Sequence, residues 1–218
     1  MTKDNHPLDF LQLFLRNDVI DSIIKHCVRY ATLTLHHDFL LTREEMCAFL
    51  GVLYLSGYVP VPRRRMLWEN SDDTQNKAVV NALRRNRFEE IFRFLHVCDN
   101  ERLDANDKFA KVRPFLTDLN EAFLRNAPYD TDVSVDESMI PYFGRYKCKQ
   151  FLRLKPVRFG YKAWVAASKG GYCLNVDLYQ GKAGNNDREP GVGLGEHVLK
   201  FVDELTNAFP SVKLSFFR

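Results

Sequence analysis

The stretch Thr131–Ala166, "TDVSVDESMIPYFGRYKCKQFLRLKPVRFGYKAWVA", decides how the fold of this chain is interpreted. It opens with a short β-type run, Val133–Val135, which is typical of a strand. The acidic pair Asp136–Glu137 follows at once, and a long basic and aromatic segment comes after it. The pattern therefore predicts a carboxylate at the end of a strand, next to a concentration of positive charge.

The stretch from Arg145 to Arg158, called here the basic segment, holds cations and aromatic rings but no acid. Cations could contact phosphates while the rings stack on bases, which favours a nucleic-acid surface. The alternative is a solvated loop whose aromatic residues pack on the core, and the sequence leaves both open. We predict that six residues of the segment bind DNA: Arg145, Lys147, Lys149, Arg153, Lys155 and Arg158.

Upstream of this stretch, the apolar residues recur at helical spacing from Asp9 to Ala127. Thr42 and Glu45 form a capping-box pattern before one helix, and Asn86 and Glu89 repeat it before another. Pro114 is compatible only with the start of a further helix. We interpret the apolar stripes of these helices as core.

The period changes after Pro128, so we predict two domains, residues 1–130 and residues 131–218. Beyond the opening run, strands are predicted over residues 162–167, 172–179 and 212–217, the first two joined by a Gly170–Gly171 turn. A loop is predicted over residues 181–193 and a helix over residues 194–209. The order β-β-β-α-β matches the start of a ribonuclease H-like core, so the fold class is α+β or α/β.

The bulk composition sets limits on the class of protein. The 218 residues include 31 Lys and Arg against 28 Asp and Glu, and this excess of +3 is too small to indicate a polyanionic partner. The five cysteines form no CxxC pair, so we expect free thiols in an intracellular protein, with neither a disulfide framework nor a zinc site. The longest apolar run, residues 46–55, is too short to span a bilayer, and we expect no membrane partner.

Several motifs together resemble the DDE-type transposase domain of the piggyBac family. They are "VSVDESMIPYFGR", "KPVRFGYKAWV" and "GYCLNVDLYQGK", with "MCAFLGVLYLSGYVPVPRRRMLW", "RNRFEEIFRFLHVCDN" and "KFAKVRPFLTDLNEAF" upstream. The upstream motifs resemble that family's dimerisation and DNA-binding region, so the resemblance implies homodimers as well as double-stranded, transposon-end-like DNA as partners.

The resemblance also implies cut-and-paste transposition, in which three aspartates hold two divalent ions, Mg²⁺ or Mn²⁺. Asp136 matches the first aspartate and is the expected catalytic residue and metal ligand. Two metals can clamp the attacking and leaving oxygens of a phosphodiester, and carboxylates on rigid strands suit such hard ions.

The sequence departs from the family pattern at its last residue. The family's second aspartate directly follows the strand that reads "VKLSFF" here, where this sequence has Arg218. We expect a chain truncated within the catalytic core that does not bind the metals stably. Asp177, Asp187 and Glu189 could be considered as replacement ligands, but no family motif matches them.

We therefore predict a transposase-derived protein that retains DNA binding or self-association and lacks strand transfer. Two alternatives stay open: a fragment of an active metal-dependent transposase or nuclease, and a structural module without DNA affinity. We expect a nuclear location. The cluster Arg63–Arg65 is either a solvated helix end or an import signal.

Overall fold

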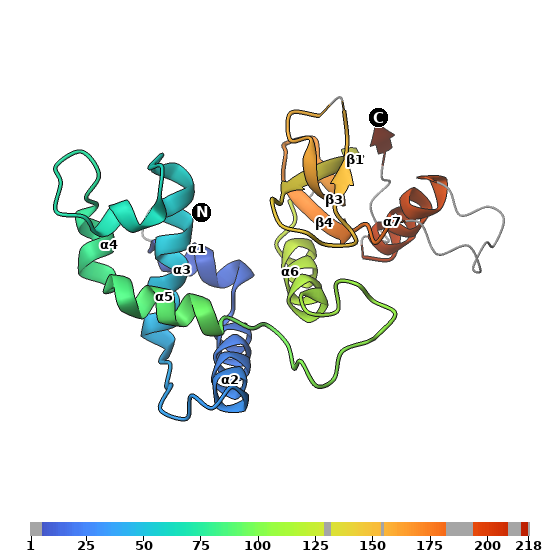
Figure 1. The fold of residues 1–218 in the computed structure, drawn as a ribbon. Helices are drawn as coiled ribbons and strands as arrows, with labels where there is room; N and C mark the ends of the chain where they lie inside the picture. The colour runs from blue at the N-terminus through green and yellow to red at the C-terminus, as the bar shows by residue number, and fades with distance from the viewer. Residues whose placement is uncertain (1–5, 129–131, 154, 182–193, 209–214, 218) are drawn as a thin grey trace. The chain divides into compact units, whose positions relative to one another are not determined.

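The computed structural model describes residues 6–128, 132–153, 155–181, 194–208 and 215–217 (Figure 1). The chain forms two compact units. The helical unit comprises Leu15–Leu103, and the sheet unit comprises Met1–Phe14 together with Asp104–Arg218. The change of sequence period near residue 130 is thus not the boundary of the compact units, because a helix upstream of it belongs with the sheet.

The helical unit is built from helices that bury one apolar stripe each. They are α2 (Asn17–Leu33), α3 (Arg43–Tyr58), the short 3₁₀ helix η1 (Arg64–Trp68), α4 (Lys77–Ala82) and α5 (Arg85–Phe94). Phe49 of α3 and Phe88 of α5 are fully buried and stack with their ring centroids 4.9 Å apart. The core predicted from helical spacing is confirmed in α2, where Ile20, Ile23 and Cys27 are buried.

Of the two capping boxes predicted from the sequence, one is confirmed and the other is wrong. Thr42 and Glu45 form the predicted capping box at the start of α3, with both hydrogen bonds 3.2 Å long. The second predicted box is wrong, because α5 begins at Arg85 and Asn86 lies inside its first turn. The side-chain cap nearby is Asn76, whose Oδ1 accepts from two amides of α4.

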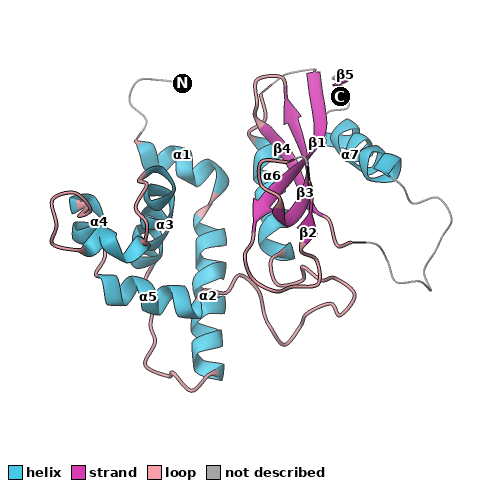
Figure 2. Ribbon diagram, turned by 45° about the horizontal axis from the view of Figure 1, so that its top comes forward, coloured by secondary structure: helices cyan, strands magenta, loops and turns pink. Residues whose placement is uncertain are grey.

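Among the residues that the structure describes, the sheet unit combines three helices with a five-stranded sheet (Figure 2). The helices are α1 (Pro7–Phe14), α6 (Arg113–Arg125) and α7 (Leu194–Ala208), and α6 carries Pro114 in its first turn as predicted. The strands are β1 (Asp132–Pro141), β2 (Gln150–Phe151), β3 (Phe159–Ser168), β4 (Cys173–Leu178) and β5 (Ser215–Phe217). The fold is therefore mixed α+β with a largely antiparallel sheet.

Strand β1 lies inside the sheet, antiparallel to β3 and parallel to β5. Strands β2 and β4 both pair with β3, β2 at its first residues and β4 along the rest. The β3–β4 turn is the predicted one, and Gly171 adopts a φ of 83°, which suits glycine. On the covered face of the sheet, Val133, Trp164 and Ala166 pack with Phe201 and Leu205 of α7.

A glycine allows the strands to approach where the basic segment returns to the sheet. A Cβ atom added to Gly160 of β3 would lie 2.0 Å from the carbonyl oxygen of Ile140 in β1. That distance is far inside van der Waals contact with backbone, so a side chain at this position would force the two strands apart. Gly160 therefore fixes the geometry of β3 next to the end of the basic segment.

The structure differs from the predicted strands in two places, and two further predicted segments lie largely outside the described residues. The first strand does not end at Val135 but continues to Pro141, so Asp136 and Glu137 lie within β1. The two-residue strand β2 was missed, because it is too short to show a period of two. The predicted loop over residues 181–193 and strand over 212–217 lie largely outside the described residues, which include only Gly181 and residues 215–217 of them.

The five cysteines are free thiols in the structure. In the described part of the chain, no helix has the length and apolarity needed to cross a membrane.

Candidate nucleic-acid interface

The acidic pair of β1 is split between the two faces of the sheet, because successive strand residues point to opposite sides. Glu137 pairs in register with Trp164 and faces the side that α7 covers, whereas Asp136 pairs with Val165 and faces the other side. The side chain of Asp136 is 78% exposed and that of Glu137 is 27% exposed. Only Asp136 is thus presented to solvent.

Glu137 is held in place by a lysine of the neighbouring strand. Its Oε2 lies 2.7 Å from Nζ of Lys162, and this hydrogen bond lowers the pKa of Glu137. The same ammonium lies 4.2 Å from the ring centroid of Trp164. Glu137 and Lys162 therefore form a fixed pair, which agrees with a structural role for the glutamate.

Asp136 has weaker partners than its neighbour. One carboxylate oxygen accepts a 2.7 Å hydrogen bond from the backbone amide of Glu137. The other lies 3.8 Å from Nζ of Lys155, which is also 3.6 Å from Oε1 of Glu137. The structure thus brings one predicted DNA-binding residue, Lys155, directly to the predicted metal ligand.

The six cations predicted to bind DNA fall into two groups. Lys155 contacts the acidic pair, and Lys149 donates to the carbonyl of Gly144 at 3.2 Å and lies 5.4 Å from the ring centroid of Phe159. The other four are exposed, and within the described residues their side chains have neither an ion pair nor a hydrogen bond: Arg145, Lys147, Arg153 and Arg158.

The aromatic residues around the basic segment also divide. Tyr142 stacks on Tyr161 with a centroid distance of 4.6 Å, and Tyr161 meets Phe109 edge-on at 5.4 Å. Burial raises the pKa of Tyr161 to about 12. These rings are packed against one another and flank the basic segment rather than lying within it.

Other rings of the region face solvent. Phe143 is 93% exposed. Phe151 and Phe159, whose rings are tilted relative to each other with their centroids 4.7 Å apart, are 55% and 53% exposed. Exposed phenylalanines beside unpartnered cations are the composition expected of a nucleic-acid surface. The region thus combines packed and exposed rings, and DNA binding by the basic segment stays a prediction.

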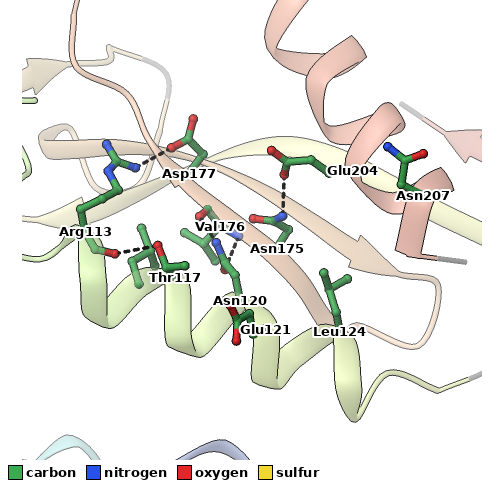
Figure 3. A pocket seen from close by; sticks show the side chains of 11 residues that line it. Arg113, Thr117, Asn120, Glu121, Leu124, Asn175, Val176, Asp177, Glu204 and Asn207 are labelled. Atoms are coloured by element: carbon green, nitrogen blue, oxygen red, sulfur yellow. Dashed lines mark hydrogen bonds and ion pairs between the residues drawn. The ribbon is translucent and has the colours of Figure 1, made fainter. Parts of the chain in front are cut away.

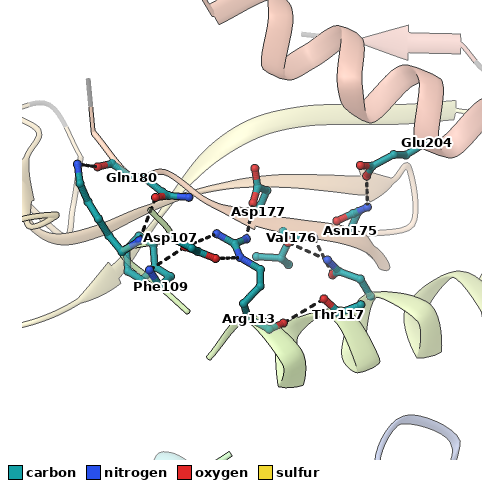
Figure 4. A network of polar contacts seen from close by, with 11 residues as sticks. Asp107, Phe109, Arg113, Thr117, Asn175, Val176, Asp177, Gln180 and Glu204 are labelled. Carbon is teal, nitrogen blue, oxygen red and sulfur yellow. Dashed lines mark hydrogen bonds and ion pairs between the residues drawn. The ribbon is translucent and has the colours of Figure 1, made fainter. Parts of the chain in front are cut away.

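A polar network joins the start of α6 to β4 (Figure 4). Arg113 of α6 contacts Asp107 at 2.7 Å and Asp177 of β4 at 2.9 Å. Asp107 consequently has a lowered pKa, chiefly through its hydrogen bonds from Arg113. Asp177, considered above as a replacement metal ligand, is thus engaged in an ion pair.

The outer edge of β4 is covered by a side chain of α6 (Figure 3). Asn120 donates to the carbonyl of Val176 at 2.9 Å and accepts from its amide at 3.0 Å, as a neighbouring strand would. A hollow of about 470 Å³ adjoins this contact, and Asn175 and Glu204 line it and are hydrogen-bonded to each other at 3.0 Å. Sequence reasoning missed this contact, because nothing in the residues around Asn120 indicates a partner in β4.

The basic cluster Arg63–Arg65 is largely engaged within the helical unit. Arg64 stacks over Phe92 at 4.4 Å, and Nε of Arg65 lies 2.5 Å from Glu89. Trp68 donates to the carbonyl of Leu83 at 2.7 Å, also within that unit. Arg64 and Arg65 thus have packing roles, and an import signal at this place stays a prediction.

The residues around Asp136 do not by themselves fit a pair of divalent ions. The resemblance to DDE-type transposases implies the use of such ions, and a two-metal site needs several carboxylates. Among the described residues, no three His, Cys, Asp or Glu side chains gather into a possible metal site. Asp187 and Glu189, the remaining candidates, lie outside the described residues.

Comparison with known proteins gives a consistent result. The transposase family described as "Transposase IS4" matches residues 6–216. PiggyBac transposable element-derived protein 3 of Homo sapiens is 49% identical over 205 residues, which cover 94% of this chain and 34% of the relative. PiggyBac transposable element-derived protein 2 of Homo sapiens is 43% identical over 200 residues, covering 91% and 33%. The chain thus spans about a third of the length of these relatives.

A solved structure has the same fold. It is a piggyBac transposase in a synaptic complex with hairpin DNA, determined by cryo-electron microscopy. The TM-score is 0.77 at 23% sequence identity, over 94% of this chain and 44% of the solved chain.

Proposed function

Because this chain is a transposase-derived member of the piggyBac family, we propose that it binds double-stranded DNA through the basic segment of its sheet unit. The observation that carries the proposal is the group of four exposed cations whose side chains have no ion pair among the described residues. Cations already paired with carboxylates gain little from a phosphate, whereas unpaired ones can release the counterions of DNA. The solved piggyBac transposase, whose fold this chain shares, is a DNA complex.

We further propose that the sheet unit is the first part of a ribonuclease H-like core, with Asp136 in the position of the first metal ligand. Two features support this topology: β1 pairs in parallel with β5, and α7 connects β4 to β5 along the chain. Asp136 is the exposed acid of β1, as a ligand must be. We also propose a nuclear location, which a DNA-binding role would require.

Salt dependence tests the DNA-binding proposal. The variant Lys147→Gln/Arg153→Gln/Arg158→Gln removes three exposed cations, so the slope of log K against log[salt] should flatten by up to ~2.7 for a duplex. Phosphate contacts carry no base information, so unrelated duplexes should be weakened about equally. Fluorescence anisotropy at a series of salt concentrations measures both effects.

A control with the same change of charge separates specific contacts from net charge. It replaces exposed cations at other places in the sheet unit: Lys111→Gln, Arg125→Gln and Lys169→Gln. An equal loss of slope in both variants, or an unchanged slope in a folded test variant, would contradict the proposal. Absence of any duplex binding by the unmodified chain would favour the structural module instead.

Strand transfer is a separate question, and we propose that the 218-residue chain alone does not perform it. Asp136 and Glu137 are the described carboxylates at mid-β1, and Lys162 already binds the glutamate. A labelled transposon-end duplex should stay intact with Mg²⁺ or Mn²⁺. Cleavage that disappears on Asp136→Asn would instead establish the alternative, an active metal-dependent fragment.

Self-association is a second candidate function, favoured by one surface of the helical unit. Tyr54 and Tyr58 lie one helical turn apart on α3 and are 54% and 86% exposed, so two aromatic rings are available on one helix face. Light scattering coupled to size exclusion should detect a dimer that Tyr54→Ser/Tyr58→Ser weakens. A monomer at all concentrations would exclude this function.

A further inference from the structure

Two lysines approach the acidic pair of β1, and they are held very differently. Lys162 extends from β3, is 15% exposed, and makes a 2.7 Å contact with Glu137. Lys155 comes from the connection between β2 and β3 and is 31% exposed. The two ammonium groups and the two carboxylates balance in charge.

Lys155 is shared between three oxygens, none at close range. Its Nζ lies 3.4 Å from the carbonyl oxygen of Glu137, 3.6 Å from Oε1 of Glu137 and 3.8 Å from Oδ2 of Asp136. Normal N–H···O hydrogen bonds measure about 2.7–3.2 Å, so these are loose contacts. A lysine on its flexible four-carbon stem can leave such contacts at low cost.

The backbone nevertheless keeps Lys155 close to Asp136. The amide of Leu152 donates to the carbonyl of Arg158 at 2.9 Å and closes the base of the β2–β3 connection. Arg153 and Arg158, both exposed, flank Lys155 on that connection. A phosphate held by these arginines would therefore lie near the acid that Lys155 neutralises.

We infer that Lys155 is the resident counter-cation of Asp136, through which this chain accepts a DNA phosphate beside the acid without a divalent ion. The inference rests on the proposed DNA binding and deepens it. Its basis is the position of the Lys155 ammonium group, which lies 3.8 Å from Oδ2 of Asp136 and 3.6 Å from Oε1 of Glu137, on a connection that also carries two exposed arginines. A cation tethered to the chain removes the repulsion between the carboxylate and the phosphate.

The first test uses Mn²⁺ alone. In Lys155→Met the positive charge is gone while the stem is kept, so the cation no longer opposes a metal at Asp136. Because the site is exposed, water screens the effect, and Mn²⁺ affinity should rise roughly tenfold. Titration followed by electron paramagnetic resonance measures the free ion. The gain should disappear in Lys155→Met/Asp136→Asn.

The matched control is Lys169→Met, at the residue that directly follows β3. Nζ of Lys169 lies 3.5 Å from Oδ2 of Asp132, so it is also a lysine in ion-pair range of a β1 aspartate. Its removal should leave Mn²⁺ binding unchanged. An equal gain in both variants, or no gain in Lys155→Met, would overturn the inference.

The second test measures duplex affinity in EDTA and in Mg²⁺ at constant ionic strength. Mg²⁺ competes for phosphates and weakens every duplex complex, so each variant is compared with the unmodified chain under the same condition. Lys155→Met should lose more affinity in EDTA than Lys147→Met, because it removes a cation and also leaves Asp136 uncompensated, and Mg²⁺ should restore part of that loss. Equal losses in the two variants, with no restoration by Mg²⁺, would overturn the inference.

The two tests separate the inference from the proposal on which it rests. If the unmodified chain binds no duplex in either condition, the DNA-binding proposal fails, and the manganese titration still decides whether Lys155 compensates Asp136. If the chain binds the duplex but only with Mg²⁺, the DNA-binding proposal holds and the inference about Lys155 fails. Circular dichroism confirms that each variant is folded.

Discussion

The arginines of the helical unit and the cations of the basic segment differ in the partners that the fold gives them. Arg87 of α5 contacts Glu45 at 2.6 Å and Glu90 at 2.7 Å, and it also donates to the carbonyl of Leu40. Arg153 and Arg158 are exposed, with no side-chain partner among the described residues. Acidic residues lie close to Arg87 in the sequence, whereas the basic segment contains none. The comparison therefore indicates that the cations of the basic segment are the ones available to a ligand.

The largest effect is expected where the basic segment joins the sheet. Gly160→Ala should destabilise the sheet unit by about 3 kcal/mol, because the new methyl group would meet the carbonyl of Ile140. Trp68 lies in the helical unit and Trp164 in the sheet unit. Fluorescence-detected urea unfolding in a Trp68→Phe background therefore reports on the sheet unit alone.

Gly170→Ala is the matched control for this change. A Cβ atom there would lie 3.8 Å from the nearest atom, the hydroxyl of Ser168, which is ordinary contact. Its effect should stay within about 0.5 kcal/mol. Similar losses in both variants would show that the sheet tolerates glycine replacement poorly everywhere, and the specific role of Gly160 would be wrong.

A smaller effect should separate the two kinds of arginine directly. Arg87→Met should cost the helical unit about 2 kcal/mol, because Glu45 and the carbonyl of Leu40 lose a partly buried partner. Arg153→Met should change stability by less than about 0.5 kcal/mol. Trp68 fluorescence in a Trp164→Phe background follows the first variant, and Trp164 fluorescence follows the second.

If Arg87→Met and Arg153→Met had the same small effect on the free energy of unfolding, the Arg87 network would contribute nothing to the fold, and the two kinds of arginine would not differ. A large loss of stability in Arg153→Met would also contradict the proposed difference. The basic segment would then be a structural element rather than a free surface.

The smallest effect concerns pH. The hydrogen bond from Arg87 lowers the pKa of Glu45 below its ordinary value of 4.5. The stabilisation is therefore present above that pH and is lost as the pH falls through the folded-state pKa. Glu45 is about one-third exposed, so the contribution should be below about 1 kcal/mol.

Urea midpoints of the helical unit between pH 6 and pH 3 measure this contribution. Glu45→Gln should flatten the acid-side decrease, and Glu69→Gln, at an exposed carboxylate of the same unit, is the control. An unchanged pH dependence in Glu45→Gln would mean that other carboxylates control acid stability.

The sequence predicted those parts of the fold that depend on local periodicity. The stripe Ile20, Ile23 and Cys27, the capping box at Thr42 and the Gly170–Gly171 turn all follow from neighbours within a few residues. It failed at Asn86, because a cap pattern alone does not determine where a helix begins. It also ended the first strand too early, because pairing with β3 continues β1 through its charged residues to Pro141.

For the site, the sequence by itself determined which charges are present: an acidic pair in one strand, then six cations without an acid. Family membership followed from the same motifs. Only the tertiary structure decided how these charges combine. Alternation along β1 exposes Asp136 and turns Glu137 toward Lys162, while the β2–β3 connection brings Lys155 to the pair across 18 residues of chain. Such contacts depend on strand register and loop closure, which are set by packing over long sequence distances and leave no local pattern to read.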